Sequence, residues 1–216
     1  AAGCVMIASF AHRFIFVAVP RTGSHTVRAA LRPHLAATDW EQCTRFETRL
    51  CPVPQIASIG HGHVPARTIR AVLLPGMWDE ITSFAVFRDP LERFVSAFFL
   101  LKRDKAWDSI EALDAMKRLL ADDKGRAHVL FSQQVSFLCD DDGQLMVSVL
   151  GLHSKLGSDL AAIFARVDLP PPLLQRVNAA PYPPGFAPDA ELRELVEYRY
   201  AADYALGSTL RETPPQ

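Results

Sequence analysis

This chain of 216 residues has little cysteine, almost no net charge and no block of basic residues. Its four cysteines (Cys4, Cys43, Cys51 and Cys139) are too few and too scattered for a disulfide-stabilised scaffold. Cys43 and Cys51 could still pair across a short loop, but such cysteines in a globular chain are more often reduced and partly buried. No C-x-x-C pair is present, which argues against a zinc ribbon or a redox motif. The net charge of −1 argues against a nucleic-acid-binding surface.

Membrane and secretory signals are also lacking. No apolar run reaches the roughly 18–20 residues that span a bilayer. The first residues show no charged segment followed by a long apolar one, so no signal peptide is evident. Asn178 is the sole asparagine, and Ala-Ala follows it instead of a glycosylation sequon. We therefore expect a cytoplasmic protein, or one of a Golgi-type lumen if an anchor precedes residue 1.

What the chain does have is alternating strand-like and helix-like segments, with 49% hydrophobic residues to form a core. Apolar runs at Phe14–Val19 and Ser83–Phe87 predict buried strands, and each is followed by a helical pattern. A short strand is predicted at Gln55–Ile59. Further helices are predicted at 109–120, 125–138, 158–167 and from 189 or 190 to 206, with Gly207 as the stop. The pattern predicts an α/β fold: one domain, residues 1–216, with a central parallel sheet flanked by helices.

The first loop, Val19 to Thr26, follows the first predicted strand and opens a helix that Pro33 should end. Gly23 allows backbone amides to approach an anion, and the helix N-terminus adds N–H donors and positive dipole charge. Further donors come from the side chains of Arg21, Thr22, Ser24 and Thr26. The phosphate-loop consensus G-x-x-x-x-G-K-[ST] is absent. A polar turn that binds nothing is the alternative.

The second loop, Phe87 to Ser96, has stronger signals. Asp89 is a helix N-cap, with Pro90 and Glu92 at the positions that favour a capping box. Arg93 and Ser96 are three residues apart and should share a helix face. Together with Arg88 they offer guanidinium and hydroxyl donors suited to a phosphate monoester. Alternatively, the acids only cap the helix and Arg93 pairs with a surface carboxylate.

A third segment, Ser58 to Pro65, carries His61 and His63 on either side of a glycine. A neutral imidazole can remove a proton from a hydroxyl near physiological pH. The pair could instead hold zinc, but a third protein ligand at typical spacing is not evident. A purely structural role is the remaining alternative. Between two anion loops, we favour a catalytic role.

These three segments together resemble the sulfotransferases that use 3′-phosphoadenosine 5′-phosphosulfate (PAPS), especially the carbohydrate branch of heparan-sulfate 2-O-sulfotransferases and their bacterial relatives. The first loop matches the family's P-K-[TS]-G-x-[TS] loop, and Arg88 to Ser96 matches R-D-P-x-x-R-x-x-S in full. Leu169 to Asn178 and the last helix resemble the family's closing segment. The resemblance implies a P-loop-NTPase-like sulfotransferase fold.

The resemblance also implies roles for individual residues. The 5′-phosphosulfate would be bound by the first loop, and the 3′-phosphate by Arg88 and Ser96. His63 would be the catalytic base, with His61 beside it and Arg21 stabilising charge on the transferred group. The residues expected to bind PAPS are Arg21, Thr22, Gly23, Ser24, His25, Thr26, Arg88 and Ser96. Arg21 stands where the family has lysine, and His25 replaces a small hydroxyl residue.

The expected reaction is in-line sulfuryl transfer to an acceptor hydroxyl, without a metal, leaving adenosine 3′,5′-bisphosphate (PAP). A carbohydrate acceptor is implied by the resemblance, and its identity would reside in Leu35–Ala57 and Lys102–Gly157. Lipid-linked sugars, small metabolites and tyrosine are alternatives. A phosphate-loop small-molecule kinase is the competing activity, although the Gly-Lys-Ser/Thr and a magnesium-holding aspartate are missing. A non-catalytic binding module on the same fold is the third possibility.

Overall fold

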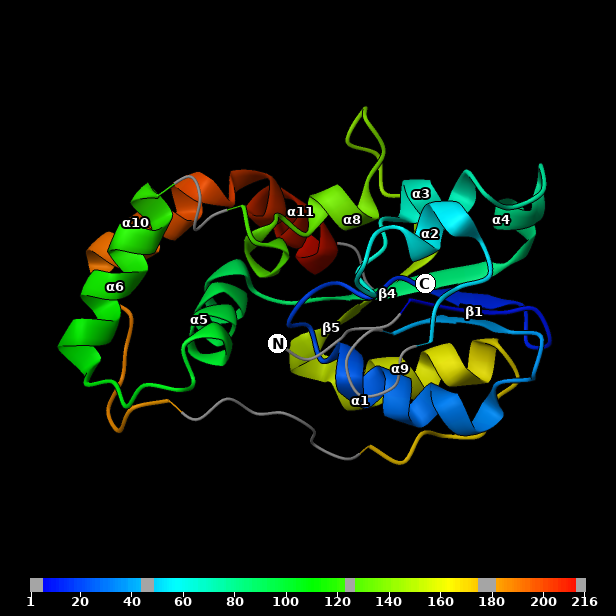
Figure 1. Ribbon diagram of the computed structural model, residues 1–216, viewed down its shortest axis with the longest axis horizontal. Coiled ribbons are helices and arrows are strands. Elements are labelled where there is room, and N and C mark those ends of the chain that lie inside the picture. The colour runs from blue at the N-terminus through cyan, green and yellow to red at the C-terminus, as the bar shows by residue number, and fades with distance from the viewer. Residues whose placement is uncertain (1–5, 44–48, 123–126, 175–181, 213–216) are drawn as a thin grey trace. The chain divides into compact units, whose positions relative to one another are not determined.

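The computed structural model describes residues 6–43, 49–122, 127–174 and 182–212, and it contains an α/β fold (Figure 1). The chain divides into two compact units. The sheet unit comprises Ala1–Phe87 and Gln134–Asn178, and the helical unit comprises Arg88–Gln133 and Ala179–Gln216. Each unit is thus built from two separate stretches of chain. That residues 1–216 form a single domain stays a prediction.

The sheet unit is built on a five-stranded mixed sheet with the order β3-β1-β2-β4-β5. Strands β2, β4 and β5 are parallel, as predicted, but β1 runs antiparallel to both β2 and β3. The expected central parallel sheet is therefore confirmed for β2, β4 and β5, whereas the sheet as a whole is mixed. The physical reason for the mixed sheet is the short turn between β1 and β2, because a tight hairpin can join only antiparallel strands. The strands are β1 (Met6–Ser9), β2 (Phe14–Phe16), β3 (Trp40–Gln42), β4 (Thr82–Phe87) and β5 (Val149–Leu152).

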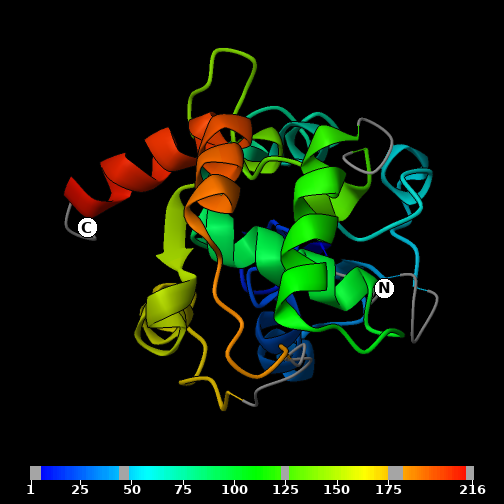
Figure 2. The same ribbon diagram turned by 90° about the vertical axis from the view of Figure 1, so that its left-hand side faces the viewer.

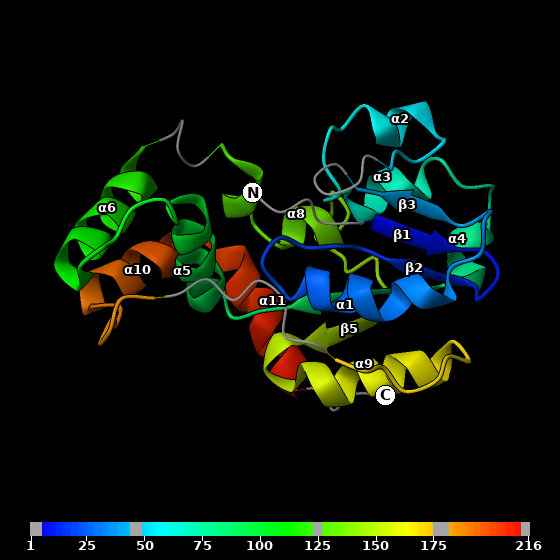
Figure 3. The same ribbon diagram turned by 60° about the horizontal axis from the view of Figure 1, so that its bottom comes forward.

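Helices cover both faces of this sheet. Helices α1 and α9 lie side by side on one face (Figures 1 and 3), and Leu31 of α1 and Phe164 of α9 share a buried core with Phe16 and Phe84 of the strands. The α1 helix ends before Pro33, as predicted. The helical elements of the sheet unit are α1 (Ser24–Leu31), η1 (Arg32–His34), α2 (Pro54–Ala57), α3 (Ala66–Arg70), α4 (Met77–Glu80), α8 (Val135–Leu138), η3 (His153–Lys155) and α9 (Leu156–Arg166).

The predicted strand at Gln55–Ile59 is wrong, because the short helix α2 occupies most of this segment. Pro54 stands in the first turn, where its fixed φ favours a helix and its missing N–H costs nothing. Val53 before it is extended, as a residue preceding proline prefers. The proline therefore outweighs the apolar character of Ile56 and Ile59.

Three helices of the helical unit begin at aspartate caps. Asp89 accepts a hydrogen bond from Glu92 N (3.0 Å), Asp108 from Glu111 N (2.9 Å) and Asp189 from Leu192 N (2.8 Å). Each cap pairs an N–H group that the first helical turn leaves unsatisfied. The elements are α5 (Pro90–Leu101), α6 (Ser109–Ala121), η2 (Val129–Phe131), α10 (Ala190–Arg199) and α11 (Ala201–Glu212).

Two predicted helices differ from the structure. The segment 125–138, whose first two residues lie outside the described chain, contains only η2 and α8, because Leu130 and Ser132 turn their carbonyls toward Arg93. The last helix is divided at Tyr200 into α10 and α11, which meet at a sharp angle (Figure 2). Gly207 lies within α11 and is not its stop, since its backbone does not adopt the left-handed conformation of a helix-ending glycine.

The described cysteines are reduced. Cys43, Cys51 and Cys139 are buried free thiols, so Cys43 and Cys51 do not form the disulfide that the sequence left open. Burial raises the pKa of the Cys51 thiol, which keeps it protonated at neutral pH. Cys4 and residues 175–178 of the predicted closing segment lie outside the described residues.

Across the described ranges, no helix combines the length and the apolar character that crossing a membrane requires. The compartment stays a prediction.

Candidate active site

The first loop folds into a tight turn directly after β2. The parallel pairing of β2 with β4 extends one residue further through Val17 N, which donates to Phe84 O (2.9 Å). Thr22 then turns its hydroxyl back to Val19 O (3.1 Å), so this buried side chain closes the turn. Arg21 (φ 64°) and Gly23 (φ 88°) both adopt left-handed backbone conformations. For an arginine this conformation is uncommon, and strained residues of this kind concentrate at functional sites.

Helix α1 begins at this turn and brings its N-terminus to the loop. Gly23 O accepts from Thr26 N (2.9 Å) and Val27 N (3.1 Å), which starts the helix. Ser24 and Thr26 are buried, whereas Arg21 and His25 are partly accessible. The N-terminal turn of a helix presents N–H groups and positive dipole charge. The predicted 5′ residues, Arg21 to Thr26, therefore lie together in an arrangement that suits an anion.

His63 lies against the segment that joins β2 to this loop. Its Nδ1 is 2.7 Å from Ala18 O, and the side chain is buried. A carbonyl oxygen only accepts hydrogen bonds, so this distance assigns the proton to Nδ1. The neutral ring then carries its lone pair on Nε2. The fold thus holds His63 next to the first loop in the tautomer that can accept a proton.

His61 supports the backbone at His63. Its Nδ1 accepts from His63 N (3.3 Å), and the two ring centroids are 5.9 Å apart. The ring of Phe137 packs edge-on against that of His63, with the two ring centroids 6.2 Å apart, and it gives His63 an apolar neighbour. Within the ranges that the structure covers, no three His, Cys, Asp or Glu side chains are grouped to hold a metal ion. That the reaction needs no metal stays a prediction.

The second loop belongs to the helical unit, starting from Arg88. This residue follows the last residue of β4 and precedes helix α5, and its Nε donates to Glu92 Oε2 (3.3 Å). One half of the predicted capping box is present, because the Asp89 side chain accepts a hydrogen bond from Glu92 N. The Glu92 carboxylate accepts its hydrogen bond from Arg88. Ser96 lies buried two turns further along α5. This arrangement presents the Arg88 guanidinium beside a capped helix N-terminus.

Arg93 does not have the role that the motif spacing predicts. Its side chain is 0% exposed and donates to Leu130 O (3.1 Å) and Ser132 O (2.6 Å). Asp203 Oδ2 lies 3.9 Å from it, and the Tyr200 ring centroid 5.3 Å. Burial lowers the pKa of the guanidinium, whereas the Asp203 carboxylate acts to raise it. Arg93 therefore connects helices inside the unit instead of facing a phosphate with Ser96.

One residue near the first loop has no counterpart in the sequence-based predictions. His153 follows β5, and its imidazole lies against Gly23: a Cβ atom built on that glycine would be 3.5 Å from His153 Cδ2. Only the strand–helix pattern around Val149–Leu152 could have signalled it. In α/β sheets, ligands bind at the carboxyl ends of the parallel strands. His153 lies at such an end, and its side chain is polar.

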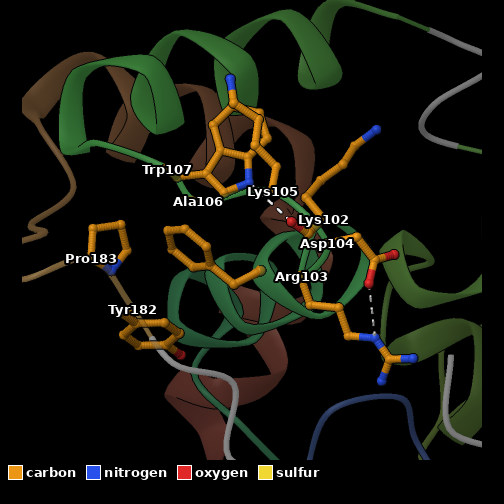
Figure 4. A pocket seen from close by; sticks show the side chains of 9 residues that line it. Lys102, Arg103, Asp104, Lys105, Ala106, Trp107, Tyr182 and Pro183 are labelled. Atoms are coloured by element: carbon orange, nitrogen blue, oxygen red, sulfur yellow. Dashed lines mark hydrogen bonds and ion pairs between the residues drawn. The ribbon is translucent and has the colours of Figure 1, made fainter.

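The helical unit also contains a cavity of about 370 Å³ (Figure 4). Its aromatic members include Phe99 and Tyr182, whose ring centroids are 5.1 Å apart, and Trp107, over which Lys105 Nζ lies at 4.0 Å. Cations outnumber the one carboxylate on its walls. The lining residues are Phe99, Lys102, Arg103, Asp104, Lys105, Ala106, Trp107, Tyr182 and Pro183.

Comparison with known proteins bears on both loops and on the histidine segment. The model of the protein family described as "Sulfotransferase family" matches residues 6–182, most of the chain. The matched range includes the first loop, His61, His63, the second loop and His153. No curated protein and no solved structure matches the chain.

Proposed function

Since this chain belongs to the sulfotransferase family and is an enzyme that uses PAPS, we propose that it transfers the sulfuryl group to a carbohydrate hydroxyl, with His63 as the base. The observation that carries this proposal is the bond between His63 Nδ1 and Ala18 O. It assigns the ring proton to Nδ1 and leaves Nε2 as the basic nitrogen that would take the acceptor's proton. The family assignment favours sulfuryl transfer over the small-molecule kinase activity.

The donor would be bound at its two anionic ends by two sets of residues. In the sheet unit, the left-handed turn of Arg21 and Gly23 and the start of α1 suit the 5′-phosphosulfate. In the helical unit, Arg88 and Ser96 would take the 3′-phosphate at the first turns of α5. An arginine at each end adds charge-assisted hydrogen bonds, which exceed neutral ones in strength.

The proposed chemistry moves one proton and one sulfuryl group. His63 Nε2 takes the proton of the acceptor hydroxyl while that oxygen forms a bond to sulfur. The bond between sulfur and the bridging phosphate oxygen breaks, and its electron pair leaves with PAP. Arg21 and the amides of the first loop stabilise the negative charge that develops there, an effect worth about 3–4 kcal/mol for one donor. No metal is needed in this scheme, because a sulfuryl group carries less charge than a phosphoryl group.

The carbohydrate acceptor rests on the resemblance to the carbohydrate branch and on the cavity of the helical unit. Aromatic faces such as that of Trp107 offer a flat apolar surface for a sugar ring. Lys102 and Arg103 add donors for hydroxyl or acidic substituents. A volume of about 370 Å³ is at the lower end of ligand pockets. Most residues that line this cavity belong to the segment Lys102–Gly157, one of the two segments expected to recognise the acceptor.

The role of His63 is tested by replacing it with asparagine. The Asn side chain can still donate to Ala18 O but has no basic nitrogen, so the fold is preserved while the base is lost. We expect kcat to fall roughly 10²–10⁴-fold. PAP affinity, measured by calorimetry, should stay within about threefold of the wild-type value.

His61→Asn is the matched control, because it changes the neighbouring imidazole and leaves the His63–Ala18 bond in place. It should lose much less activity than His63→Asn. If His63→Asn retained full kcat, the base assignment would be wrong, and His61 or His25 would become the candidate.

A further inference from the structure

Two helices of the sheet unit begin at the first loop, not one. Helices α1 and α9 run side by side in the same direction from this end of the sheet (Figures 1 and 3). A Cβ atom built on Gly23 would lie 3.2 Å from Leu156 Cδ2, where α9 begins. The N-terminal turns of both helices therefore meet at the loop. Positive dipole charge from two helices is directed to the same place.

His153 lies at this meeting point. The Cβ position of Gly23 is 3.5 Å from His153 Cδ2 and 3.9 Å from His153 Nε2, so the ring edge that contains Nε2 faces the loop. The residue follows β5, which is parallel to β4, as β4 is to β2. The carboxyl ends of β2 and β5 thus deliver Gly23 and His153 to one edge of the sheet.

Gly23 adopts a backbone conformation that suits glycine. Its φ of 88° is one that L-residues rarely adopt, and a Cβ atom there would crowd Leu156 Cδ2 at 3.2 Å and meet His153 Cδ2 at an ordinary contact distance of 3.5 Å. The imidazole therefore lies next to the loop at Gly23. A group bound by the loop amides would then be within reach of the same imidazole.

We propose that His153 is a further donor-binding residue, whose Nε2–H donates a hydrogen bond to an oxygen of the 5′-phosphosulfate on the first loop. This inference rests on the proposed function. In the reaction, His153 gives up no proton: it holds its hydrogen bond while charge builds on the departing phosphate. His63 and His153 thus divide the work, the first accepting the acceptor's proton and the second stabilising the leaving group.

The inference is tested with three variants and PAP as the probe. His153→Phe keeps a ring of similar size but removes the donor. His153→Gln restores an N–H near the Nε2 position. Leu156→Ala removes the side chain nearest to the Cβ position of Gly23 and leaves His153 unchanged. Thermal unfolding without nucleotide shows that each variant is folded, and calorimetry gives the PAP affinity.

We expect His153→Phe to weaken PAP binding by roughly tenfold or more, as for a lost hydrogen bond to a charged group. His153→Gln should recover most of the affinity, and Leu156→Ala should stay within about threefold of wild type. Equal losses of PAP affinity in His153→Phe and Leu156→Ala would show that side-chain packing, not the N–H group of His153, supports binding, and would overturn the inference. So would wild-type affinity in His153→Phe. If the wild-type protein itself failed to bind PAP, the proposed function would fall first.

Discussion

Replacing Arg93 by methionine should destabilise the helical unit strongly. The guanidinium is fully buried and supplies hydrogen bonds to Leu130 O and Ser132 O, with the Asp203 carboxylate, also 0% exposed, 3.9 Å away. Methionine leaves these acceptors without a donor and leaves a buried carboxylate without its cation. Breaking a buried ion pair in this way costs about 3–5 kcal/mol. For a chain of this length, the loss corresponds to a fall in Tm of about 6–20 °C.

Urea unfolding and thermal unfolding measure this loss directly. Arg118→Met, on the exposed face of α6, is the matched control and should change stability by no more than about 0.5 kcal/mol. Combining Arg93→Met with Asp203→Asn removes the buried charge and should recover about 1–3 kcal/mol. If Arg93→Met unfolded like the wild-type protein but bound PAP poorly, the arginine would be a phosphate ligand, as the motif spacing suggested, and the interior role would be refuted.

Three further predictions concern nucleotide binding, acceptor binding and the stability of the protein at acid pH. Arg88→Ala should weaken PAP binding by roughly tenfold or more, with Arg118→Ala unchanged, and equal affinities in calorimetry would contradict the 3′ assignment. Trp107→Ala should raise the KM for the acceptor without altering PAP affinity. An unchanged KM with the true acceptor would show that this cavity does not bind the acceptor. The hydrogen bond from Lys117 lowers the pKa of Asp189 in the folded protein. The ionised Asp189 therefore stabilises the fold fully above the ordinary carboxyl pKa of about 3.9, and this contribution is lost as the pH falls through the lowered pKa. Asp189→Asn should therefore melt below wild type at pH 6 and approach it at pH 2, whereas a constant difference would contradict the linkage.

Local signals predicted the parts of the fold that the chain determines locally. The apolar runs identified β2 and β4, and the Asp-Pro-x-Glu pattern identified the start of α5, because strand burial and helix capping depend on adjacent residues. The first loop followed from β2, whereas the place of His63 depends on its contact with Ala18, 45 residues away in the sequence. The strands β1, β3 and β5 were not predicted. Glu41 and Gln42 make β3 polar, and Gly151 interrupts the apolar residues of β5.

Long-range contacts decided the rest. Arg93 lies in a polar motif, and only Leu130, Ser132 and Asp203, distant in sequence, make it an interior residue. Tyr200, at which the last helix is divided, donates its hydroxyl to Phe131 O (2.8 Å), 69 residues away in the sequence. His153 reaches Gly23 through the order of the strands, which no local pattern encodes.

We propose that the chain binds a nucleotide by the two phosphate ends that PAPS and PAP share. Calorimetric titration of the purified protein with PAP, beside ATP with Mg²⁺, tests it most directly. We predict tight binding of PAP without added metal and weak binding of ATP. Tight ATP–Mg²⁺ binding with none of PAP would contradict the donor site described here.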